Sequence, residues 1–552
     1  MNRYQGKKIL LMGLGGFVKG SGVSAAEFLA RAGADLTITD LKSAKELSRN
    51  LRRLKKFKNI KYVLGEHREK DFKETEWVVR NPDVPPSSPF LDIARRRGIF
   101  IDNDITLFFR EYGVEQVIGV TGTRGKSTTA SLIYEMVRQR SDSARRLKDA
   151  WQEFSISNGA RQEFSSARLV PTARLGGNIG ESPLRFLDFY LSRRNHEARL
   201  SNNCHSERNE PSYVGANGIE ESILANLMVG DGLAPVVLEL SNFQLSDLDT
   251  IKMSPRVAVW TNLYPDHLNK YSSIKEYISD KEKIFKYQKA GDAAVLNWDN
   301  EVTRRIGKKL QNVLFFSLKK KPRDGAYIKN GWFMFVKSGK ETRICKISDT
   351  KLLGEHNLSN TLAAICAARS FGAVWPAIKA AIKNFNGVPN RLELVKIRNG
   401  VKFINDCAAT SPEATIAALK SFPAGKMILI SGGNSKGSPL KEMARFMAKM
   451  AKAIILMPGK VNEELRQELR QRVVLTTPKR GKTCLPCLSA GRQAGRNLPL
   501  IFDVKSLKEA INQAVKIARK GDVVLFSPGL TWLPRQNEFA RGEEFKRIIK
   551  LV

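Results

Sequence analysis

The fold is decided by one stretch of the sequence, Val117-Ile118-Gly119-Val120-Thr121-Gly122-Thr123-Arg124-Gly125-Lys126-Ser127-Thr128-Thr129-Ala130. The apolar run from Val114 to Val120 predicts a buried strand, and apolar residues at helical spacing between Ser127 and Val137 predict a helix. A glycine-punctuated turn lies between them. The stretch therefore predicts strand, loop and helix in an α/β domain, with Gly-Lys-Ser at the mouth of the helix.

This loop has the composition of a phosphate-binding site. Backbone N–H groups at a helix N-terminus have no intrahelical acceptor and carry the positive end of the helix dipole, so they attract phosphate. Gly122 and Gly125 let the backbone wrap the phosphates, Lys126 supplies a cation, and the Ser127 hydroxyl can bind Mg²⁺. The spacing departs from G-x-x-x-x-G-K-[ST], because Val120 occupies the first glycine position. The alternative is an ordinary glycine-rich turn.

Length and charge limit the class of protein. At 552 residues the chain is too long for one core, and about 150 residues per domain suggests three or four domains. Lys and Arg exceed Asp and Glu by 92 − 55 = 37, which favours an anionic partner such as nucleic acid, a membrane surface or a small molecule. The charge is spread from end to end without an RNA-binding signature. We interpret it mainly as a solvated surface that favours a polyanionic substrate.

Cysteine usage and hydropathy predict a cytoplasmic protein. The six cysteines are few and scattered, which fits a reducing compartment. Cys484 and Cys487 form a close pair, but without a second pair or a nearby histidine the pair is more simply incidental than a zinc knuckle. No apolar run approaches the ~18 residues of a membrane span. The apolar segment after Lys7-Lys8 is too short for a signal peptide.

A second ligand-binding pattern lies near the N-terminus. A glycine-rich turn that includes Gly15 follows the first expected strand, and Asp40 follows the second. This layout binds a nucleotide diphosphate, although the irregular glycine spacing makes it weak as a dinucleotide fingerprint. The expected elements are strand Ile9 to Met12, turn Gly13 to Gly22, helix Val23 to Ala32 and strand Asp35 to Thr39.

Two later strands carry polar residues at their carboxyl ends. Glu239 closes the apolar run that starts at Val236, and His267 follows the strand from Val257 to Asn262. Ligand chemistry in parallel sheets collects at this edge, so both residues are expected beside the phosphate loop if the strands are neighbours. A carboxylate suits Mg²⁺, and a histidine can complete a shell made mostly of phosphate oxygens. Alone, His267 would more often be a hydrogen-bonding residue.

Three segments have no sustained periodicity: 138–174, 193–232 and 476–497. Long structureless loops are unusual in compact domains, so we interpret all three as insertions. We assign no ligand role to His196 and His205, which lie in the second.

The order of the motifs resembles that of the Mur ligases. The motifs are Gly122–Thr128, Gly176–Gly180, Glu239–Leu245, Pro265–His267, Gly354–Asn360 and Asn405-Asp406. The resemblance runs from about residue 7 to 550, and its motifs are specific jointly. The Glu239–Leu245 run, together with the glycine-rich N-terminal unit, is similar to the D-glutamate-adding branch of that family.

The resemblance implies an α/β protein of three domains. These are an N-terminal Rossmann-like UDP-binding domain (1–113), a central P-loop ATPase-like domain with a parallel sheet (114–388, with two of the insertions) and a C-terminal Rossmann-like amino-acid-binding domain (389–552, with the third). The implied activity is ATP-dependent addition of D-glutamate to UDP-N-acetylmuramoyl-L-alanine through an acyl phosphate, in bacterial peptidoglycan precursor synthesis. ATP and two Mg²⁺ sites are implied, with no specific nucleic acid partner, no membrane span and a monomeric state.

The resemblance also assigns residue roles. Catalysis falls to Lys126, His267 and Lys281, and metal binding to Ser127, Glu239, His267 and Lys281. ATP binding falls to Gly122, Thr123, Gly125, Lys126, Ser127, Thr128, Asn357, Asn360, Arg391 and Asp406. Substrate binding falls to Gly15, Asp40, Asn178, Lys436 and Phe539.

Lys281 matches a family lysine that CO₂ converts to an anionic carbamate. From the residues alone, Lys281 is one of several lysines on a basic helix, and a solvated face is the simpler interpretation. Its offset from Tyr277 and the motif order favour the carbamate. The chain departs from the family at Arg124, Asn390, Ala408 and Leu41, which replace an asparagine, a histidine, a lysine and a threonine, and Gly529–Pro534 is shorter and bulkier than the family loop.

Two other functions stay open. One is a different Mur ligase or a folylpolyglutamate-synthetase-like ligase, which would differ in amino acid and acceptor. The other is a basic nucleotide- or nucleic-acid-binding protein without ligase activity, which salt-sensitive RNA binding would indicate.

Overall fold

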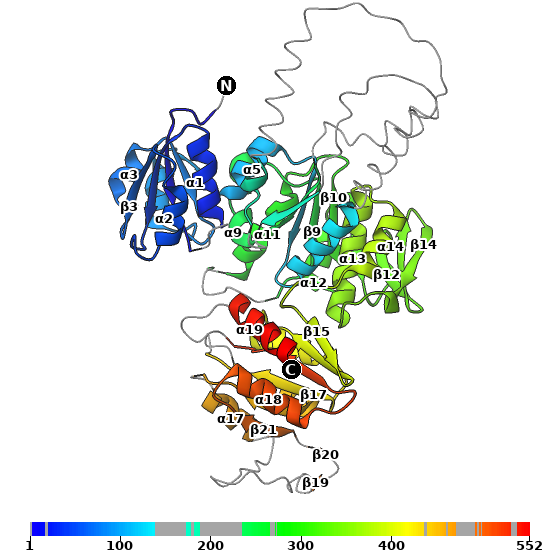
Figure 1. Ribbon diagram of the computed structural model, residues 1–552. Coiled ribbons are helices and arrows are strands. Elements are labelled where there is room, and N and C mark those ends of the chain that lie inside the picture. Colours follow the sequence, from blue (N-terminus) through cyan, green and yellow to red (C-terminus); the bar gives the residue numbers. More distant parts are fainter. Residues whose placement is uncertain are drawn as a thin grey trace, which may run out of the picture. The chain divides into compact units, whose positions relative to one another are not determined.

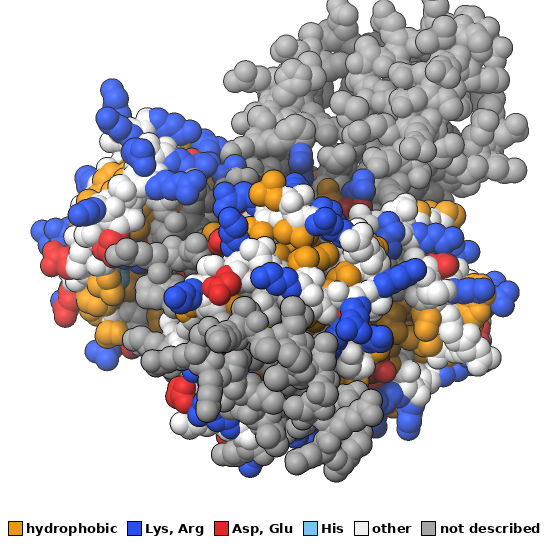
Figure 2. Space-filling view, turned by 60° about the horizontal axis from the view of Figure 1, so that its bottom comes forward, with side chains coloured by type: hydrophobic (Ala, Val, Ile, Leu, Met, Phe, Trp, Pro, Cys, Tyr) orange, Lys and Arg blue, Asp and Glu red, His pale blue; other side chains and the backbone are white. Residues whose placement is uncertain are grey.

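The computed structural model describes residues 3–16, 20–138, 173–177, 181–187, 234–264, 271, 273–434, 439–459, 462–470, 492–493, 496–497, 499–530 and 538–552 (Figure 1). The chain divides into two compact units. The first contains Met1–Thr350 and Ser359–Asn384, and the second contains Lys351–Leu358 and Phe385–Val552. Among the described residues, no helix is both long and apolar enough to cross a bilayer. Lys and Arg side chains are scattered over the described part of the face in Figure 2.

The N-terminal sheet has five parallel strands in the order β3-β2-β1-β4-β5. Ile9, Leu10, Leu11 and Met12 are at most 2% exposed, as expected for a parallel strand covered on both faces. The predicted strand, glycine-rich turn, helix and strand are confirmed as β1, α1 and β2. The elements are β1 (Lys8–Met12), α1 (Ser21–Arg31), β2 (Asp35–Asp40), α2 (Ser48–Leu54), β3 (Ile60–Leu64), α3 (Glu69–Glu74), β4 (Trp77–Arg80), α4 (Pro89–Arg96) and β5 (Phe100–Asp102).

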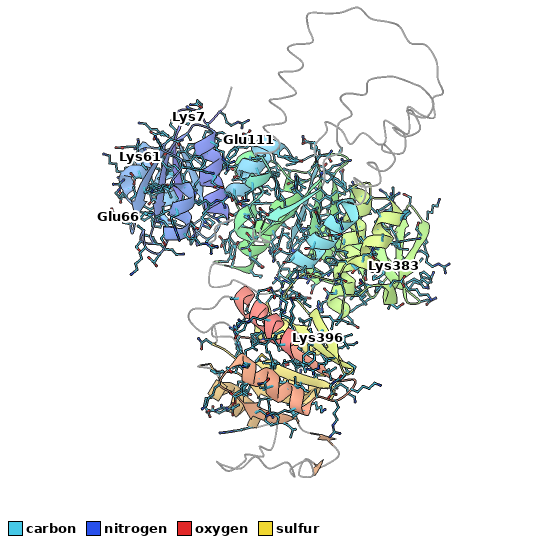
Figure 3. All side chains as sticks on the ribbon, in the orientation of Figure 1. Lys7, Lys61, Glu66, Glu111, Lys383 and Lys396 are labelled. Carbon is cyan, nitrogen blue, oxygen red and sulfur yellow. The ribbon has the colours of Figure 1, made fainter. Side chains whose placement is uncertain are left out.

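Helix α5 (Asp104–Tyr112) connects this sheet to the next one. Its start is fixed by a capping box: Asn103 Oδ1 accepts from the backbone N–H groups of Ile105 and Thr106, and Thr106 Oγ1 accepts from Asn103 N. Near its end, Glu111 (labelled in Figure 3) accepts a 2.9 Å hydrogen bond from Tyr4. The helix is therefore held at both ends.

The central sheet has nine strands in the order β14-β13-β12-β11-β10-β9-β6-β8-β7. The seven from β7 to β12 are parallel, which confirms the expected parallel sheet, and β13 and β14 extend it as an antiparallel meander that the sequence analysis did not anticipate. The strands are β6 (Val117–Thr121), β7 (Arg174–Gly177), β8 (Val236–Glu239), β9 (Val257–Trp260), β10 (Ala293–Asn297), β11 (Val313–Ser317), β12 (Gly325–Lys329), β13 (Trp332–Lys337) and β14 (Lys340–Lys346).

A helix over 126–138 follows β6, which confirms the expected strand, loop and helix. Its apolar residues Leu132, Ile133, Met136 and Val137 are at most 1% exposed. The other helices of the first unit are a single turn at 184–187, α9 (Asn242–Leu245), α10 (Leu248–Ile251), α11 (Ile274–Lys286), α12 (Glu301–Gly307), the 3₁₀ turn Ile347–Asp349, and α14 (Trp375–Asn384). Helix α13 (Glu355–Ser370) begins in the second unit and continues in the first.

The C-terminal sheet has six strands in the order β15-β16-β22-β17-β18-β21, parallel except for edge strand β15. Lys396 of β15 (labelled in Figure 3) donates to the last carbonyl groups of α19, where a cation offsets the helix dipole. The elements are β15 (Glu393–Arg398), β16 (Val401–Asn405), α15 (Pro412–Leu419), β17 (Met427–Ser431), α16 (Lys441–Met450), β18 (Ala451–Leu456), α17 (Asn462–Arg470), β21 (Leu500–Asp503), α18 (Leu507–Ile517), β22 (Val523–Phe526) and α19 (Glu538–Leu551).

Most of the three expected insertions lies outside the described residues. Arg138 ends a described helix and Arg174 begins β7, so the edges of the first expected insertion belong to regular elements. In the third, β19 (Arg492–Gln493) and β20 (Arg496–Asn497) pair as a short antiparallel ladder. Cys484, Cys487, His196 and His205 lie outside the described residues.

Candidate active site

The phosphate loop joins β6 to the helix that begins at Lys126, and its two glycines are required. Gly122 has φ +146° and Gly125 has φ +81°, both in the region that favours glycine. A Cβ on Gly122 would lie 2.0 Å from Thr261 Oγ1, and a Cβ on Gly125 would lie 2.2 Å from Asn360 Oδ1. The loop is therefore a backbone cradle that no side chain could enter from these positions, as phosphate binding through amide groups demands.

Residues that follow β9 hold the loop in shape. Asn262 O accepts from Thr123 N at 3.0 Å, and Asn262 Oδ1 accepts from Arg124 N at 2.9 Å. Thr261 Oγ1 donates to Arg124 O at 2.7 Å. Sequence reasoning missed these two supports. The signal for them was a Thr-Asn pair at the end of a buried strand, beside the strand that leads into the loop.

Lys126 and Lys281 meet at the first glycine of the loop. Lys126 Nζ donates to Gly122 O at 3.0 Å and to Thr123 O at 3.3 Å. Lys281 Nζ, from helix α11, donates to Gly122 O at 3.4 Å. Two residues far apart in sequence thus direct their ammonium groups at one carbonyl oxygen.

Lys281 is a buried residue, with 1% of its surface exposed. Its Nζ lies 4.8 Å from the ring centroid of Tyr277, which is equally buried and one helical turn earlier on α11. This contact is a cation–π interaction. The solvated-face interpretation of Lys281 is therefore wrong: α11 turns this lysine towards the phosphate loop.

Glu239 ends β8 next to the loop strand. In the sheet, Glu239 pairs with Val120 of β6 on one side and with Gly177 of β7 on the other. A Cβ on Gly177 would lie 2.2 Å from Glu239 O, so the glycine permits the two strands to end side by side. Glu239 is 3% exposed. The predicted meeting of the phosphate loop and the acidic strand end at one sheet edge is confirmed.

The run after Glu239 builds a turn of helix and supports its neighbours. Ser241 and Gln244 form a capping box at the start of α9: Gln244 Oε1 accepts from Ser241 N at 3.0 Å. Asn242 Nδ2 donates to Tyr271 OH at 2.5 Å, and Tyr271 OH donates to Asp280 of α11 at 3.0 Å. Burial, together with the Asp280 carboxylate, raises the pKa of Tyr271 and keeps its phenol protonated. The motif therefore links β8 to the helix that carries Lys281.

Four predicted site residues have side chains outside the described part of the chain. His267, Asn178 and Lys436 lie outside the described residues, and Phe539 is described only as part of the backbone of α19. Within the described ranges, no group of three His, Cys, Asp or Glu residues could by itself hold a metal ion. Metal binding there would need oxygen ligands such as Glu239 and Ser127 together with phosphate oxygens.

Asp40 at the end of β2 holds the N-terminal glycine-rich turn. Its Oδ2 accepts from Leu14 N at 2.8 Å and from Gly15 N at 3.2 Å, and its Oδ1 accepts from Lys42 N at 2.9 Å. Asn50 Nδ2 donates to Gly15 O at 2.6 Å. Asp40 therefore shapes the turn, and its predicted contact with substrate stays a prediction.

The two asparagines of α13 contact different segments. Asn360 is 5% exposed and lies against Gly125 of the phosphate loop. Asn357 Nδ2 donates to Leu353 O at 2.8 Å. The predicted adenine contacts of both stay predictions.

In the second unit, Asp406 at the end of β16 braces the turn around Arg391. Its Oδ1 accepts from Leu392 N at 3.1 Å, and its Oδ2 accepts from Ser527 Oγ at 2.9 Å. Burial raises the pKa of Asp406 to about 7, although the two hydrogen bonds and Arg391 lower it. Asn390 and Leu392, which flank Arg391, have φ of +67° and +45°. Such angles are strained for leucine, so this turn is held by its surroundings.

Comparisons with known proteins point to one family in all three parts of the chain. Three family models match: the Mur ligase MurD-like N-terminal domain at residues 7–102, the Mur ligase middle domain at 203–368, and the Mur ligase glutamate ligase domain at 390–530. The UDP-N-acetylmuramoylalanine–D-glutamate ligase of Roseiflexus sp. is 35% identical, with 99% of this chain and 98% of the relative covered. The enzyme of the same name from Acetivibrio thermocellus is 32% identical, with 100% and 97% covered. The crystal structure of UDP-N-acetylmuramate-alanine ligase from Thermotoga maritima shares the fold, with a TM-score of 0.52, 18% identity and 99% of each chain covered.

Proposed function

This chain belongs to the Mur ligase family, and on that basis we propose that it is the ATP-dependent ligase that joins D-glutamate to UDP-N-acetylmuramoyl-L-alanine in peptidoglycan precursor synthesis. The observation that carries the proposal is the meeting of the phosphate loop, Glu239 and Lys281 at one edge of the central sheet. The full-length relatives of this name support the choice of D-glutamate.

The reaction must first activate a carboxylate, which amines do not attack near neutral pH. The acceptor carboxylate attacks the γ-phosphorus of ATP, the bond to ADP breaks and an acyl phosphate forms. The amine of D-glutamate then attacks the acyl carbon, loses a proton and displaces phosphate to leave an amide. The protein contributes mainly position and charge neutralisation.

The phosphate loop supplies both contributions. Gly122, Thr123, Gly125, Ser127 and Thr128 offer backbone and hydroxyl donors around the cradle that the glycines keep open. Lys126 donates to Gly122 O and Thr123 O in this structure, and in the reaction it would donate to the transferring phosphoryl group in their place. Its positive charge stabilises the charge that develops on the phosphoryl oxygens.

The donor set fits magnesium. Ser127 and the buried Glu239 would supply oxygen ligands, and His267 and the carbamate of Lys281 would complete the proposed set. Mg²⁺ held by these residues would neutralise part of the phosphate charge.

The carbamate at Lys281 has a physical rationale. Lys126 and Lys281 lie within 3.0 and 3.4 Å of the same oxygen, so two ammonium groups there repel each other. A neutral Lys281 amine can add to CO₂ and release a proton, and the resulting carbamate anion would be attracted to Lys126 and to a metal. Modification thus turns a repulsive pair into an attractive one.

The remaining roles follow the family pattern. Asn357, Asn360, Arg391 and Asp406 would contact the nucleoside and phosphates of ATP, and Gly15, Asp40 and Asn178 would contact UDP-N-acetylmuramoyl-L-alanine. Lys436 and Phe539 would receive D-glutamate. The proposed domains are 1–113, 114–388 and 389–552, in a cytoplasmic monomer.

The test is phosphate release by purified enzyme with ATP, Mg²⁺ and UDP-N-acetylmuramoyl-L-alanine. Addition of D-glutamate should raise the steady rate and yield a product heavier by one glutamate residue. An equal rate without D-glutamate, or a higher rate with L-alanine or a diamino acid, would overturn the proposal.

A further inference from the structure

One buried carboxylate joins three segments that border the proposed acceptor site. Asp104, the first residue of α5, is 1% exposed. Its Oδ2 accepts from Ser182 Oγ at 2.8 Å, and its Oδ1 accepts from Gln244 Nε2 at 3.4 Å. The Ser21 hydroxyl also interacts with this carboxyl group and lowers its pKa. Burial raises the pKa of Asp104 above its usual value, and the hydrogen bonds around the carboxyl group offset part of that rise.

Each partner of Asp104 adjoins a different part of the site. Ser21 opens α1, directly after the glycine-rich turn that Asp40 holds. Ser182 follows Glu181, whose carbonyl accepts from Gly177 N at 2.9 Å at the end of β7. Gln244 closes the capping box that follows Glu239. Helix α5 packs against α1 and α9, both labelled beside it in Figure 1.

Helix capping does not account for Asp104. Asn103 already caps α5, because its side chain accepts from Ile105 N and Thr106 N while Thr106 reciprocates. A buried carboxylate is costly to keep unless donors surround it. The hydrogen bonds from Ser182 and Gln244 come from two distant segments, and Ser21 interacts with the carboxyl group from a third. The benefit that offsets this cost is that all three segments meet at one carboxyl group.

We propose that Asp104 is a positioning residue for the acceptor substrate. It fixes the start of α1, the end of β7 and helix α9 relative to one another. The UDP-binding turn and the sheet edge beside Glu239 are thereby placed to receive opposite ends of one extended substrate. The inference rests on the proposed function for the identity of that substrate. ATP binds at the phosphate loop, whose supports come from Thr261 and Asn262 and not from Asp104. A change at Asp104 should therefore alter the affinity for the acceptor substrate without altering the affinity for ATP.

The variants are Ser182→Ala and Asp104→Asn, with Ser254→Ala as the matched control. Ser254 is also a buried serine, 2% exposed, but its hydroxyl donates to Lys283 O at 3.0 Å and accepts from Tyr287 N at 3.1 Å. The dissociation constant of UDP-N-acetylmuramoyl-L-alanine is measured by calorimetry, and KM for ATP and kcat are measured by phosphate release.

Ser182→Ala should weaken acceptor binding about tenfold, since one hydrogen bond to the buried Asp104 carboxyl group is lost. KM for ATP should stay within about twofold, and in the Asp104→Asn background Ser182→Ala should add less than about twofold. Unchanged acceptor affinity in Ser182→Ala would overturn the inference, as would an equal rise in KM for ATP. If the wild-type enzyme binds the acceptor but does not ligate D-glutamate, the proposed function fails while the affinities still decide this point.

Discussion

Lys126 and Lys281 donate to the same oxygen, Gly122 O, at 3.0 and 3.4 Å. One lysine comes from the loop itself and the other from a helix about 150 residues further along the chain. This convergence supports the view that Lys281 belongs to the catalytic site. The two lysines have different proposed roles in catalysis: Lys126 is a permanent cation, and Lys281 is an amine that can be modified.

Lys126→Ala should lower kcat at least about 100-fold, because the transferring phosphoryl group loses its charge partner. The matched control is Lys275→Ala, which removes an exposed lysine of α11 and should leave kcat unchanged. Phosphate release at saturating ATP measures both. Near-normal kcat in Lys126→Ala would remove this lysine from the mechanism.

Lys281→Ala should also inactivate the enzyme, but acetate or formate should restore part of the activity by replacing the carbamate. The same salts should not rescue Lys126→Ala, whose lost group is a cation. Wild-type enzyme in CO₂-depleted buffer should lose activity and regain it with bicarbonate. A fully active Lys281→Ala variant would refute the carbamate.

Gly125→Ala should raise KM for ATP at least about tenfold, because the new Cβ would lie 2.2 Å from Asn360 Oδ1 and displace the loop. Gly291→Ala is the control for backbone strain alone. Gly291 has φ +93°, and a Cβ there would meet nothing within 4 Å. It should cost about 1 kcal/mol of stability and leave KM unchanged. Equal KM values for the two variants would contradict a tight phosphate cradle.

The buried Asp406 should make folding stability depend on pH. Its pKa is raised from 3.8 to about 7 by burial, so the folded chain keeps a proton that the unfolded chain releases. Between pH 3.8 and about 7, unfolding releases a proton. The free energy of unfolding therefore falls by about 1.4 kcal/mol for each pH unit as pH rises. Above about 7 this contribution is constant.

Urea unfolding at pH 5 and pH 8 checks this effect in wild type and in Asp406→Asn. The difference in stability between the two proteins should favour wild type more at pH 5 than at pH 8. A difference that does not change with pH would show that Asp406 does not titrate in this window.

Strands β1, β2, β6, β8 and β9 could be predicted from the sequence because each is a short apolar run that a turn or a polar residue ends. The position of the candidate site at the carboxyl edge of the central sheet could be predicted from the rule that ligands bind there. In the structure, Val120, Glu239 and Gly177 lie side by side at this edge. Strands β13 and β14 were missed, since nothing in a single apolar run reveals antiparallel pairing.

Side-chain direction was the main limit of sequence reasoning. Lys281 sits on a helix rich in lysine, and only tertiary packing turns it inward against Tyr277. Asp104 was overlooked for the same reason: its partners Ser21, Ser182 and Gln244 are far apart in sequence. No local pattern reports a carboxylate that joins three segments.

The central claim is that ATP activates the acceptor carboxylate at the phosphate loop. The most direct measurement uses UDP-N-acetylmuramoyl-L-alanine with ¹⁸O in its carboxylate and analyses the phosphate released after ligation of D-glutamate by mass spectrometry. An acyl phosphate transfers one carboxylate oxygen, so each phosphate should carry one ¹⁸O atom. Phosphate without ¹⁸O would contradict the account.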